Sequence, residues 1–457
     1  MTSSTVGENF WGSKGRIRDG VWGDVPVDKA VRTLLETAAM TRLKGISSLG
    51  FAHFAFPAAR HTGFDHAVGV YHLTRLTLKK ITDSGAYLED RDVRGSLAAA
   101  LLAEVGRYPY PWAVEGINLP GMVLRDEETR HVIEETEVAE VLRETWDLEP
   151  HNVFRLAARG AGEYDEGFGT GAPLRDLTPT EHLVRDLLSG ALNLATLDYL
   201  VRDTRGAQLP FGNVDVGALI NSLRIVGQDN RAVLALDESG VGHLQSLIFA
   251  RYLMHYNVYS HHALRIPTAM FLRAVQDAVQ TEEISAGELI RQDDAGALAL
   301  ISRSAADPGG SSATLVRRLT ERRPYKRALE LDERHPSYAS LIRLRDDASW
   351  RRRVEEAWAR YLTRYRKGVA GSFDILIDLP ENKRFDVGLR VILCSTGLAH
   401  GERNPVTWQG ISGLSEEDMV RYHAPLHRIR IATATDDLAT SVRRHADELF
   451  TIAEEVG

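Results

Sequence analysis

The stretch LGFAHFAFPAARHTGFDHAVGVYHL, residues Leu49–Leu73, decides the fold of this 457-residue chain. A mainly hydrophobic run ends at Pro57, and the polar segment after it carries His61, Asp65 and His66. An aspartate suits the positive end of a helix dipole, so we expect His61 and Asp65 to cap a helix that begins here. His66 then has two interpretations: a core histidine hydrogen-bonded to the backbone, or a ligand in a site.

Three further blocks follow in order along the chain. Leu101–Tyr110 reads LLAEVGRYPY, Leu197–Asp203 reads LDYLVRD, and a later block spaces an arginine, a histidine and a tyrosine four residues apart. With the first stretch, these blocks resemble the deoxynucleoside-triphosphate triphosphohydrolase branch of the HD-domain superfamily, over roughly residues 40–400. The resemblance implies a mainly α fold, in which an HD-domain helical core carries a small α/β lobe at its C-terminal end.

The resemblance also implies how a divalent metal would be held, by a histidine, a His-Asp pair on the next helix and an aspartate on a later helix. These four positions are His66, Ala103, Glu104 and Ala195 in this chain. Imidazole and carboxylate groups suit Mn, Fe, Ni, Co or Mg, and such an ion would activate water for phosphate hydrolysis. Alanine has no lone pair to donate. We therefore expect no bound metal and no other cofactor, with His66 as the remnant of the ligand set and His61 and Glu104 as weak alternatives.

The histidines that the family uses for catalysis are also replaced. By the same resemblance they fall at Arg107, Trp112 and Asp126. Any remaining catalysis would have to use His66, Glu104, Arg107 or Asp126. We expect Glu104 to be a buried partner of Arg107 or His66 rather than a metal ligand. Our hypothesis for Arg107 is that its charge replaces the metal in holding a phosphate or another anion.

A second group of residues agrees with the family pattern. The later block is Arg251, His255 and Tyr259, whose spacing places all three on one helix face. In the family this arginine and its neighbouring tyrosines line the nucleotide, and arginine binds phosphate oxygens well. The resemblance therefore implies ligand contacts from Tyr199, Asp203, Arg251, His255, Tyr259 and Arg107. An ion-paired structural helix is an equal alternative for the later block.

Composition limits the function classes. The 55 Lys and Arg residues against 63 Asp and Glu give a net charge of −8, which argues against a general nucleic-acid binder but not against a local nucleotide site. Cys394 is the only cysteine, so neither an intrachain disulfide nor a cysteine-based zinc site is expected. No signal peptide and no apolar run of membrane-spanning length are found, so we expect a cytoplasmic protein without a membrane partner.

The chain divides into four predicted segments. Residues 1–26 form a Gly-rich N-terminal arm, 27–302 the HD-like helical core, 303–313 a linker, and 314–457 the α/β lobe with a closing helix. Thr178-Pro179-Thr180-Glu181 predicts a capped helix start within the core. In the lobe, 374–380 and 387–393 are predicted as strands.

Three functions remain open at this point. The first is a degenerate HD protein that binds a nucleotide or another phosphorylated small molecule as a regulator or partner. The second is an active phosphohydrolase, or a repurposed enzyme for a nucleoside-like substrate, with a non-standard site. The third is a structural subunit with a filled pocket. The resemblance implies a homo-oligomer, a dimer or a tetramer, in each case.

Overall fold

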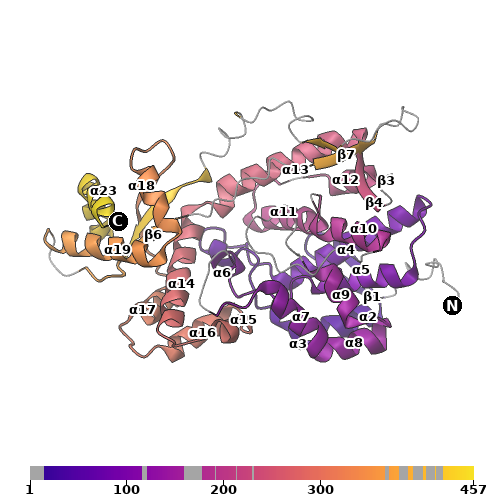
Figure 1. Ribbon diagram of the computed structural model, residues 1–457, viewed down its shortest axis with the longest axis horizontal. Coiled ribbons are helices and arrows are strands. Elements are labelled where there is room, and N and C mark those ends of the chain that lie inside the picture. The colour runs from indigo at the N-terminus through magenta and orange to yellow at the C-terminus, as the bar shows by residue number, and fades with distance from the viewer. Residues whose placement is uncertain are drawn as a thin grey trace.

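The described residues are mostly helical and also form three small sheets of two, four and three strands (Figure 1). The computed structural model describes residues 15–115, 121–158, 178–190, 192–212, 214–228, 231–365, 370–379, 390–394, 405–407, 417 and 426–456. The purple and magenta helices of the first half lie together on one side, and the orange and yellow C-terminal lobe lies on the other (Figure 1). The predicted fold class, a helical core with a small strand-containing lobe, is confirmed.

The described part of the N-terminal arm is a β-hairpin. Strand β1 (Gly15–Asp19) pairs antiparallel with β2 (Gly23–Val27), and together they form the two-stranded sheet. An isolated hairpin is marginal in water, so it needs a surface to pack on. Val25 and Val27 supply this contact, because both are buried in the main hydrophobic cluster of the core helices.

Among the described residues, twelve helical segments build the core, and all of them except α6 contribute side chains to one large apolar cluster. They are α2 (Lys29–Leu35), α3 (Ala38–Leu43), η1 (Gly50–Phe54), α4 (Gly63–Asp83), α5 (Asp90–Leu102), α6 (Pro111–Val114), α7 (Arg125–Glu135), α8 (Glu137–Trp146), α9 (Pro150–Ala157), α10 (Pro179–Ser189), α11 (Leu194–Ala207) and α12 (Val216–Ser222). The predicted start of α10 is confirmed: Thr178 caps it, Pro179 opens it and Glu181 completes a capping box. For the site, α4 and α11 matter most, because they pack against each other.

A four-stranded sheet joins distant parts of the chain. Its order is β3-β4-β7-β8, with β3 (Leu223–Gln228) antiparallel to β4 (Arg231–Asp237) and β7 (Arg390–Cys394) parallel to β4. Strand β8 (Pro405–Thr407) closes it. The strand predicted at 387–393 was placed in the C-terminal lobe, which is wrong: β7 pairs with β4 of the core instead.

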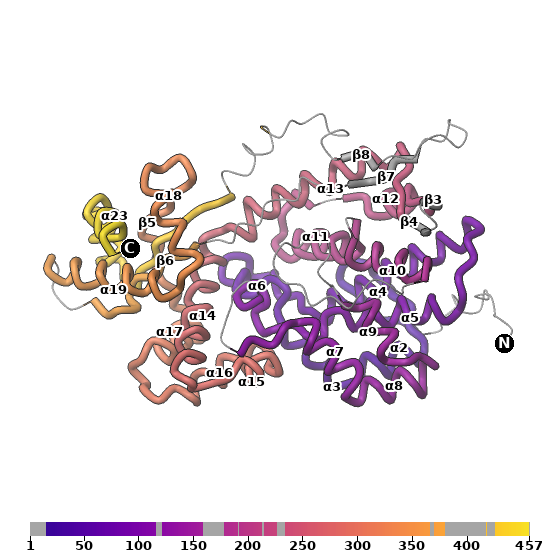
Figure 2. The backbone as a smooth tube through the Cα atoms, in the orientation of Figure 1, coloured from indigo at the N-terminus to yellow at the C-terminus, as the bar shows by residue number. Residues whose placement is uncertain are grey.

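A long helical path leads from the core to the lobe (Figure 2). After η3 (Glu238–Gly240) come α13 (Val241–Met254), the π-helical segment η4 (His255–Tyr259) and α14 (His262–Gln280). Helices α15 (Ala286–Ile290), α16 (Asp294–Ser304) and α17 (Ser311–Thr320) follow, and α17 packs against α14. Residues 305–310, within the predicted linker, connect α16 to α17.

The C-terminal lobe is a three-stranded sheet covered by helices. The order is β5-β9-β6, with β5 (Lys326–Leu331) and β6 (Ile375–Asp378) both antiparallel to β9 (Ile429–Thr433). Its helices are α18 (Tyr338–Ile342), η5 (Arg343–Arg345), α19 (Ala348–Thr363), α22 (Asp436–Arg444) and α23 (Ala446–Glu455). The lobe has its own apolar cluster, centred on the fully buried Trp358.

Candidate functional site

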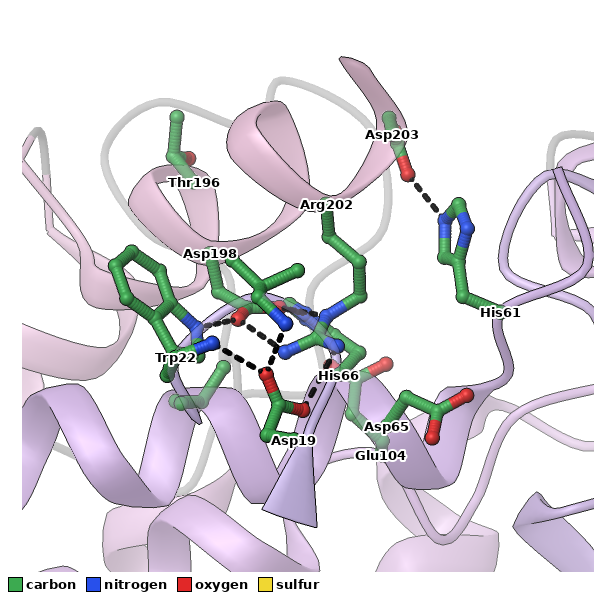
Figure 3. Close-up of polar contacts among 12 residues, drawn as sticks. Asp19, Trp22, His61, Asp65, His66, Glu104, Thr196, Asp198, Arg202 and Asp203 are labelled. Carbon is green, nitrogen blue, oxygen red and sulfur yellow. Dashed lines mark hydrogen bonds and ion pairs between the residues drawn. The ribbon is translucent and has the colours of Figure 1, made fainter. Parts of the chain in front are cut away.

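His66 lies in the first turn of α4. The helix begins there because Thr62 caps it and Asp65 returns a hydrogen bond to the cap, so Asp65 has the predicted capping role. His66 is buried, and its Nδ1 lies 2.7 Å from Oδ2 of Asp198 on α11 (Figure 3). His66 is thus a satisfied core histidine, but its partner is a carboxylate rather than the predicted backbone group.

Asp198 is the centre of a buried hydrogen-bond network. Arg202, one turn later on α11, donates from Nε and Nη2 to the two carboxylate oxygens at 2.9 and 2.8 Å, and the indole Nε1 of Trp22 donates to Oδ1 at 2.6 Å. Burial raises the pKa of Asp198, but hydrogen bonds from His66 and Arg202 outweigh it and hold that pKa at about 2. Asp198 is therefore an anion at neutral pH.

The tip of the N-terminal hairpin covers this network (Figure 3). Arg202 reaches across to Asp19 with Nη1 at 2.9 Å, and Asp19 also accepts the backbone N–H groups of Val21 and Trp22. Sequence reasoning missed Asp19 and Trp22, since an aromatic in a Gly-rich segment does not show which surface it meets. The one available signal was Arg202, because a buried arginine needs acceptors and could have prompted a search for an acidic partner such as Asp19.

Glu104 lies in a second cluster of charged residues. Its Oε1 accepts a 2.9 Å hydrogen bond from Arg125, and its Oε2 is ion-paired with Nε of Arg107. Arg107 is also 3.9 Å from Glu115. The predicted pairing of Glu104 with Arg107 is confirmed. The charge of Arg107 is balanced by carboxylates, which weakens our hypothesis that this arginine stands ready to hold a phosphate.

Asp126, a catalytic candidate, lies in the first turn of α7. Its charge acts on two arginines, Arg125 and Arg185, whose pKa values it raises. For Arg185 burial has the larger effect and lowers the pKa overall. Asp126 thus lies near the Arg125–Glu104 ion pair, and no contact between Asp126 and His66 is described.

A third cluster contains several of the predicted ligand contacts. Nε2 of His61 lies 2.6 Å from Oδ1 of Asp203, and the hydroxyl of Tyr259 donates to Oδ2 of Asp203 at 2.7 Å. His61 was predicted to cap α4, which is wrong: its ring turns to α11 instead. Burial, followed by the charge of Asp203, raises the pKa of Tyr259 well above its ordinary value, while Arg251 acts in the opposite direction. Tyr259 is therefore a neutral donor.

Aromatic rings close this cluster on one side. Trp112 is stacked on Tyr259, with ring centroids 5.4 Å apart and 17° between the planes, and its indole donates to the carbonyl of Ser48 at 2.7 Å. His255 meets the edge of Tyr259 at 4.8 Å. Trp112 is 40 % exposed, so it is partly accessible to solvent.

The predicted single α-helical face for Arg251, His255 and Tyr259 needs correction. The α-helix ends at Met254, and His255–Tyr259 form a π-helical turn. Residues four apart in such a turn do not align along one face as they do in an α-helix. Arg251 and Tyr199 are nevertheless close enough to Tyr259 for their charges to act on it. The structure thus brings together Tyr199, Asp203, Arg251, His255 and Tyr259, whereas Arg107 pairs with Glu104.

The chain is similar to known proteins in both sequence and fold. Residues 214–395 match a protein family described as the HD associated region. A phosphohydrolase structure from Bacteroides thetaiotaomicron superposes with a TM-score of 0.66 at 17 % identity, covering 92 % of this chain and 100 % of that one. Together these matches support an assignment of the chain to the HD-domain superfamily.

Curated relatives match over part of their length. The uncharacterized protein MJ1154 of Methanocaldococcus jannaschii is 22 % identical over 286 residues, which are 63 % of this chain and 54 % of that protein. The deoxynucleoside triphosphate triphosphohydrolase SAMHD1 of Gallus gallus is 22 % identical over 275 residues, 57 % of this chain and 45 % of that protein. The chain spans about half the length of the curated relatives it matches.

The donor set of this HD-domain chain does not fit the metal that the superfamily implies. His66 alone is suitable, because a ring whose Nδ1 is held by a carboxylate keeps Nε2 for a ligand. Ala103 and Ala195 offer no donor atoms, and both oxygens of Glu104 are bound by arginines. Within the described ranges no three His, Cys, Asp or Glu side chains come together as a possible metal site.

In the part of the chain that the structure describes, every helix is too short or too polar to cross a lipid bilayer.

Proposed function

We propose that this HD-domain chain does not hydrolyse nucleotides through a divalent metal and instead binds a nucleotide or another phosphorylated small molecule in a regulatory or partner role. The proposal depends on one observation, the ion pairing of Glu104 with two arginines. This carboxylate is the nearest substitute for the lost His-Asp pair, and Arg107 and Arg125 bind both of its oxygens. Two guanidinium groups at this point would repel a divalent cation, and the carboxylate would have to release them to bind it.

The ligand side of the proposal is supported by the cluster around Tyr259. Arg251 provides a cation near a neutral tyrosine hydroxyl, and Trp112 offers an exposed ring face next to them. Arginine binds phosphate with parallel N–H groups, and an indole face stacks on a flat base. These two features together favour a phosphorylated ligand with an aromatic base.

The relatives support the same ligand class. SAMHD1 carries the name of a deoxynucleoside triphosphate triphosphohydrolase, and its match covers 57 % of this chain. We extend to this chain the binding of such a nucleotide but not its cleavage. A cytoplasmic homo-oligomer, dimer or tetramer, without membrane or nucleic-acid partners is part of this proposal.

Thermal unfolding with and without nucleotide tests the proposal. A ligand that binds only the native state raises stability by RT ln(1 + [L]/Kd), so dGTP or dATP is expected to raise the unfolding temperature of the wild-type chain. Arg251→Gln and Trp112→Ala should each reduce the shift, whereas Arg94→Gln, on the surface of α5, should keep it. Triphosphate release is measured on the same samples with Mn²⁺ present. Turnover that depends on Mn²⁺ would favour the enzyme, and no shift with any nucleotide would favour a structural subunit.

A further inference from the structure

Asp294, the first residue of α16, is a buried carboxylate that holds two separate loops. The residue is 6 % exposed. Its Oδ1 accepts a hydrogen bond from the backbone N–H of Tyr110, and its Oδ2 accepts one from the backbone N–H of Ser47, both at 2.8 Å. Its own N–H donates to the carbonyl of Gly45 at 3.2 Å. Hydrogen bonds to an ionised acceptor are stronger than those between neutral groups, so Asp294 ties both loops to the start of α16.

Both loops lead to the indole of Trp112. Tyr110 precedes Trp112 by two residues, and Ser47 directly precedes Ser48, whose carbonyl accepts the indole N–H at 2.7 Å. One carboxylate therefore fixes the backbone on both sides of this hydrogen bond. The ring placed in this way is the one that stacks on Tyr259, with centroids 5.4 Å apart.

The backbone of Tyr110 has a conformation that bulky residues rarely adopt. Its φ of 47° and ψ of 58° lie in the left-handed region. Its ring is stacked on Phe51, with centroids 4.2 Å apart, and meets Phe271 at 4.7 Å. Such a conformation persists only where the surrounding contacts outweigh its cost, and the bond to Asp294 is one of them. Because α6 begins at the next residue, the direction of the backbone at Tyr110 determines where Trp112 lies.

Arg42 of α3 holds the same region from the other side. Its guanidinium donates to four backbone carbonyls at 2.7–2.9 Å, two of them in the turn before Tyr110 and two just before α16: Val105, Arg107, Ile290 and Gln292. Arg42 thus binds backbone acceptors where Asp294 binds backbone donors. The turn that leads to Tyr110 is therefore fixed to the start of α16 by two buried charged groups.

The two hydrogen bonds to Asp294 require its ionised form. A protonated carboxyl carries a hydrogen on one oxygen, so only its other oxygen can still accept an N–H in the same way. Burial raises the pKa of Asp294 to about 6, hydrogen bonds from Ser47 and Tyr110 oppose this, and the charge of Asp293 adds to it. Two more titratable groups interact with Asp294: Arg42, whose pKa burial lowers to about 10, and the hydroxyl of Tyr110, whose pKa burial raises. Near pH about 6 the carboxyl therefore changes from holding two loops to holding one.

We propose that Asp294 is a positioning residue of the candidate ligand site, whose carboxylate keeps Trp112 stacked on Tyr259 by holding Ser47 and Tyr110 at the same time. Loss or protonation of the carboxylate releases one loop, and the indole then separates from Ser48 and becomes more exposed. The inference rests on the proposed function for the ligand that Trp112 would contact. The position of the ring is a property of the chain without ligand.

Acrylamide quenching of tryptophan fluorescence tests the inference on the full chain without any ligand. The chain has seven tryptophans, so the signal of Trp112 is the difference between each protein and its Trp112→Phe counterpart. In the wild type this signal should be quenched weakly at pH about 7.5 and about twofold more strongly at pH about 5, because protonation releases one loop. Asp294→Asn should give the stronger quenching at both pH values, since an amide has one acceptor oxygen and turns a donor toward the second N–H.

Asp293→Asn is the matched control, because this neighbouring carboxylate accepts a hydrogen bond from Gly296 rather than from either loop. It should keep the pH-dependent quenching of Trp112, with the midpoint moved slightly to lower pH because a charge that raises the pKa of Asp294 is gone. Thermal unfolding checks that each variant is folded. If Asp294→Asn is not, the pH dependence of the wild type alone decides.

Equal quenching of Trp112 in the wild type and in Asp294→Asn at pH about 7.5, or a wild-type signal that is the same at both pH values, would overturn the inference. Nucleotide binding separates this result from the proposed function. If dGTP raises the unfolding temperature of the wild type, Asp294→Asn should reduce that shift, and an undiminished shift would count against the inference. If dGTP gives no shift in the wild type, the proposed function fails, whereas the quenching still decides the role of Asp294.

Discussion

Nδ1 of His66 and Oδ2 of Asp198 are 2.7 Å apart, in a pair whose side chains are 4 % and 0 % exposed. The pair links α4 to α11, and the family resemblance gives His66 as a position expected to hold a metal ion. Arg202 and Trp22 complete the hydrogen bonding of the aspartate, so the carboxylate is stabilised by protein groups alone. The negative charge of Asp198 is therefore balanced within the protein by Arg202.

Removing the aspartate should destabilise the protein strongly. Asp198→Ala leaves Arg202 buried without its main partner, and breaking a buried ion pair in this way costs about 3–5 kcal/mol. Asp83→Ala is the matched control, because that carboxylate forms an exposed pair with Lys79, worth about 0.5 kcal/mol. The free energy of unfolding in urea measures both. Similar small losses in the two variants would show that the network contributes little.

Gly69 on α4 leaves space for the side chains of Asp198 and Arg202, so we expect this position to tolerate only glycine. A Cβ at Gly69 would lie 1.8 Å from Oδ1 of Asp198 and 2.4 Å from Arg202, so Gly69→Ala should displace both side chains and destabilise the protein by about 2 kcal/mol or more. A Cβ at Gly242 of α13 meets nothing within 4 Å. Gly242→Ala should therefore stabilise by about 0.5–1 kcal/mol through helix propensity. Chemical denaturation of both variants compares them, and a stabilising Gly69→Ala would refute the close packing.

The stability of the protein should depend on pH through Asp186 of α10. Burial raises the pKa of this carboxyl to about 6, against the opposing effect of Arg185. The native state therefore penalises the ionised form, so stability is lost as the pH rises from about 4 through 6 and stays lower above. Asp186→Asn removes this ionisation and should gain about 1–2 kcal/mol at pH about 7.5 but little at pH about 4.5. Urea unfolding at the two pH values measures the difference. A gain of equal size at both would mean that ionisation is not its cause.

Much of the helical core could be predicted from local signals. The cap at Thr178, the capping aspartate Asp65 and the pairing of Glu104 with Arg107 depend on residues close in sequence, and the structure has all three. Ala103 and Ala195 offer no donor atoms, but their place in a metal-ligand set is still a prediction from the resemblance. These features need no knowledge of which helices meet.

The remaining features depend on contacts between distant segments. Trp22 reaches Asp198 across 176 residues, and β7 pairs with β4 although the two strands lie more than 150 residues apart. Neither the side-chain pattern of the arm nor that of the strand identifies its partner. His255–Tyr259 form a π-helical turn, although the four-residue spacing of Arg251, His255 and Tyr259 is typical of an α-helix. The sequence pattern therefore could not distinguish a π-helical turn from an α-helix.

Elemental analysis of the purified full chain tests the central claim most directly. The account predicts that, after dialysis against a solution of Mn, Fe, Ni, Co and Mg salts and removal of free ions, the protein retains far less than one equivalent of any of them. His66→Ala should then leave the metal content unchanged. One tightly held equivalent that is lost in His66→Ala would contradict the account, because it would show that this corner grips a divalent ion despite its two alanines.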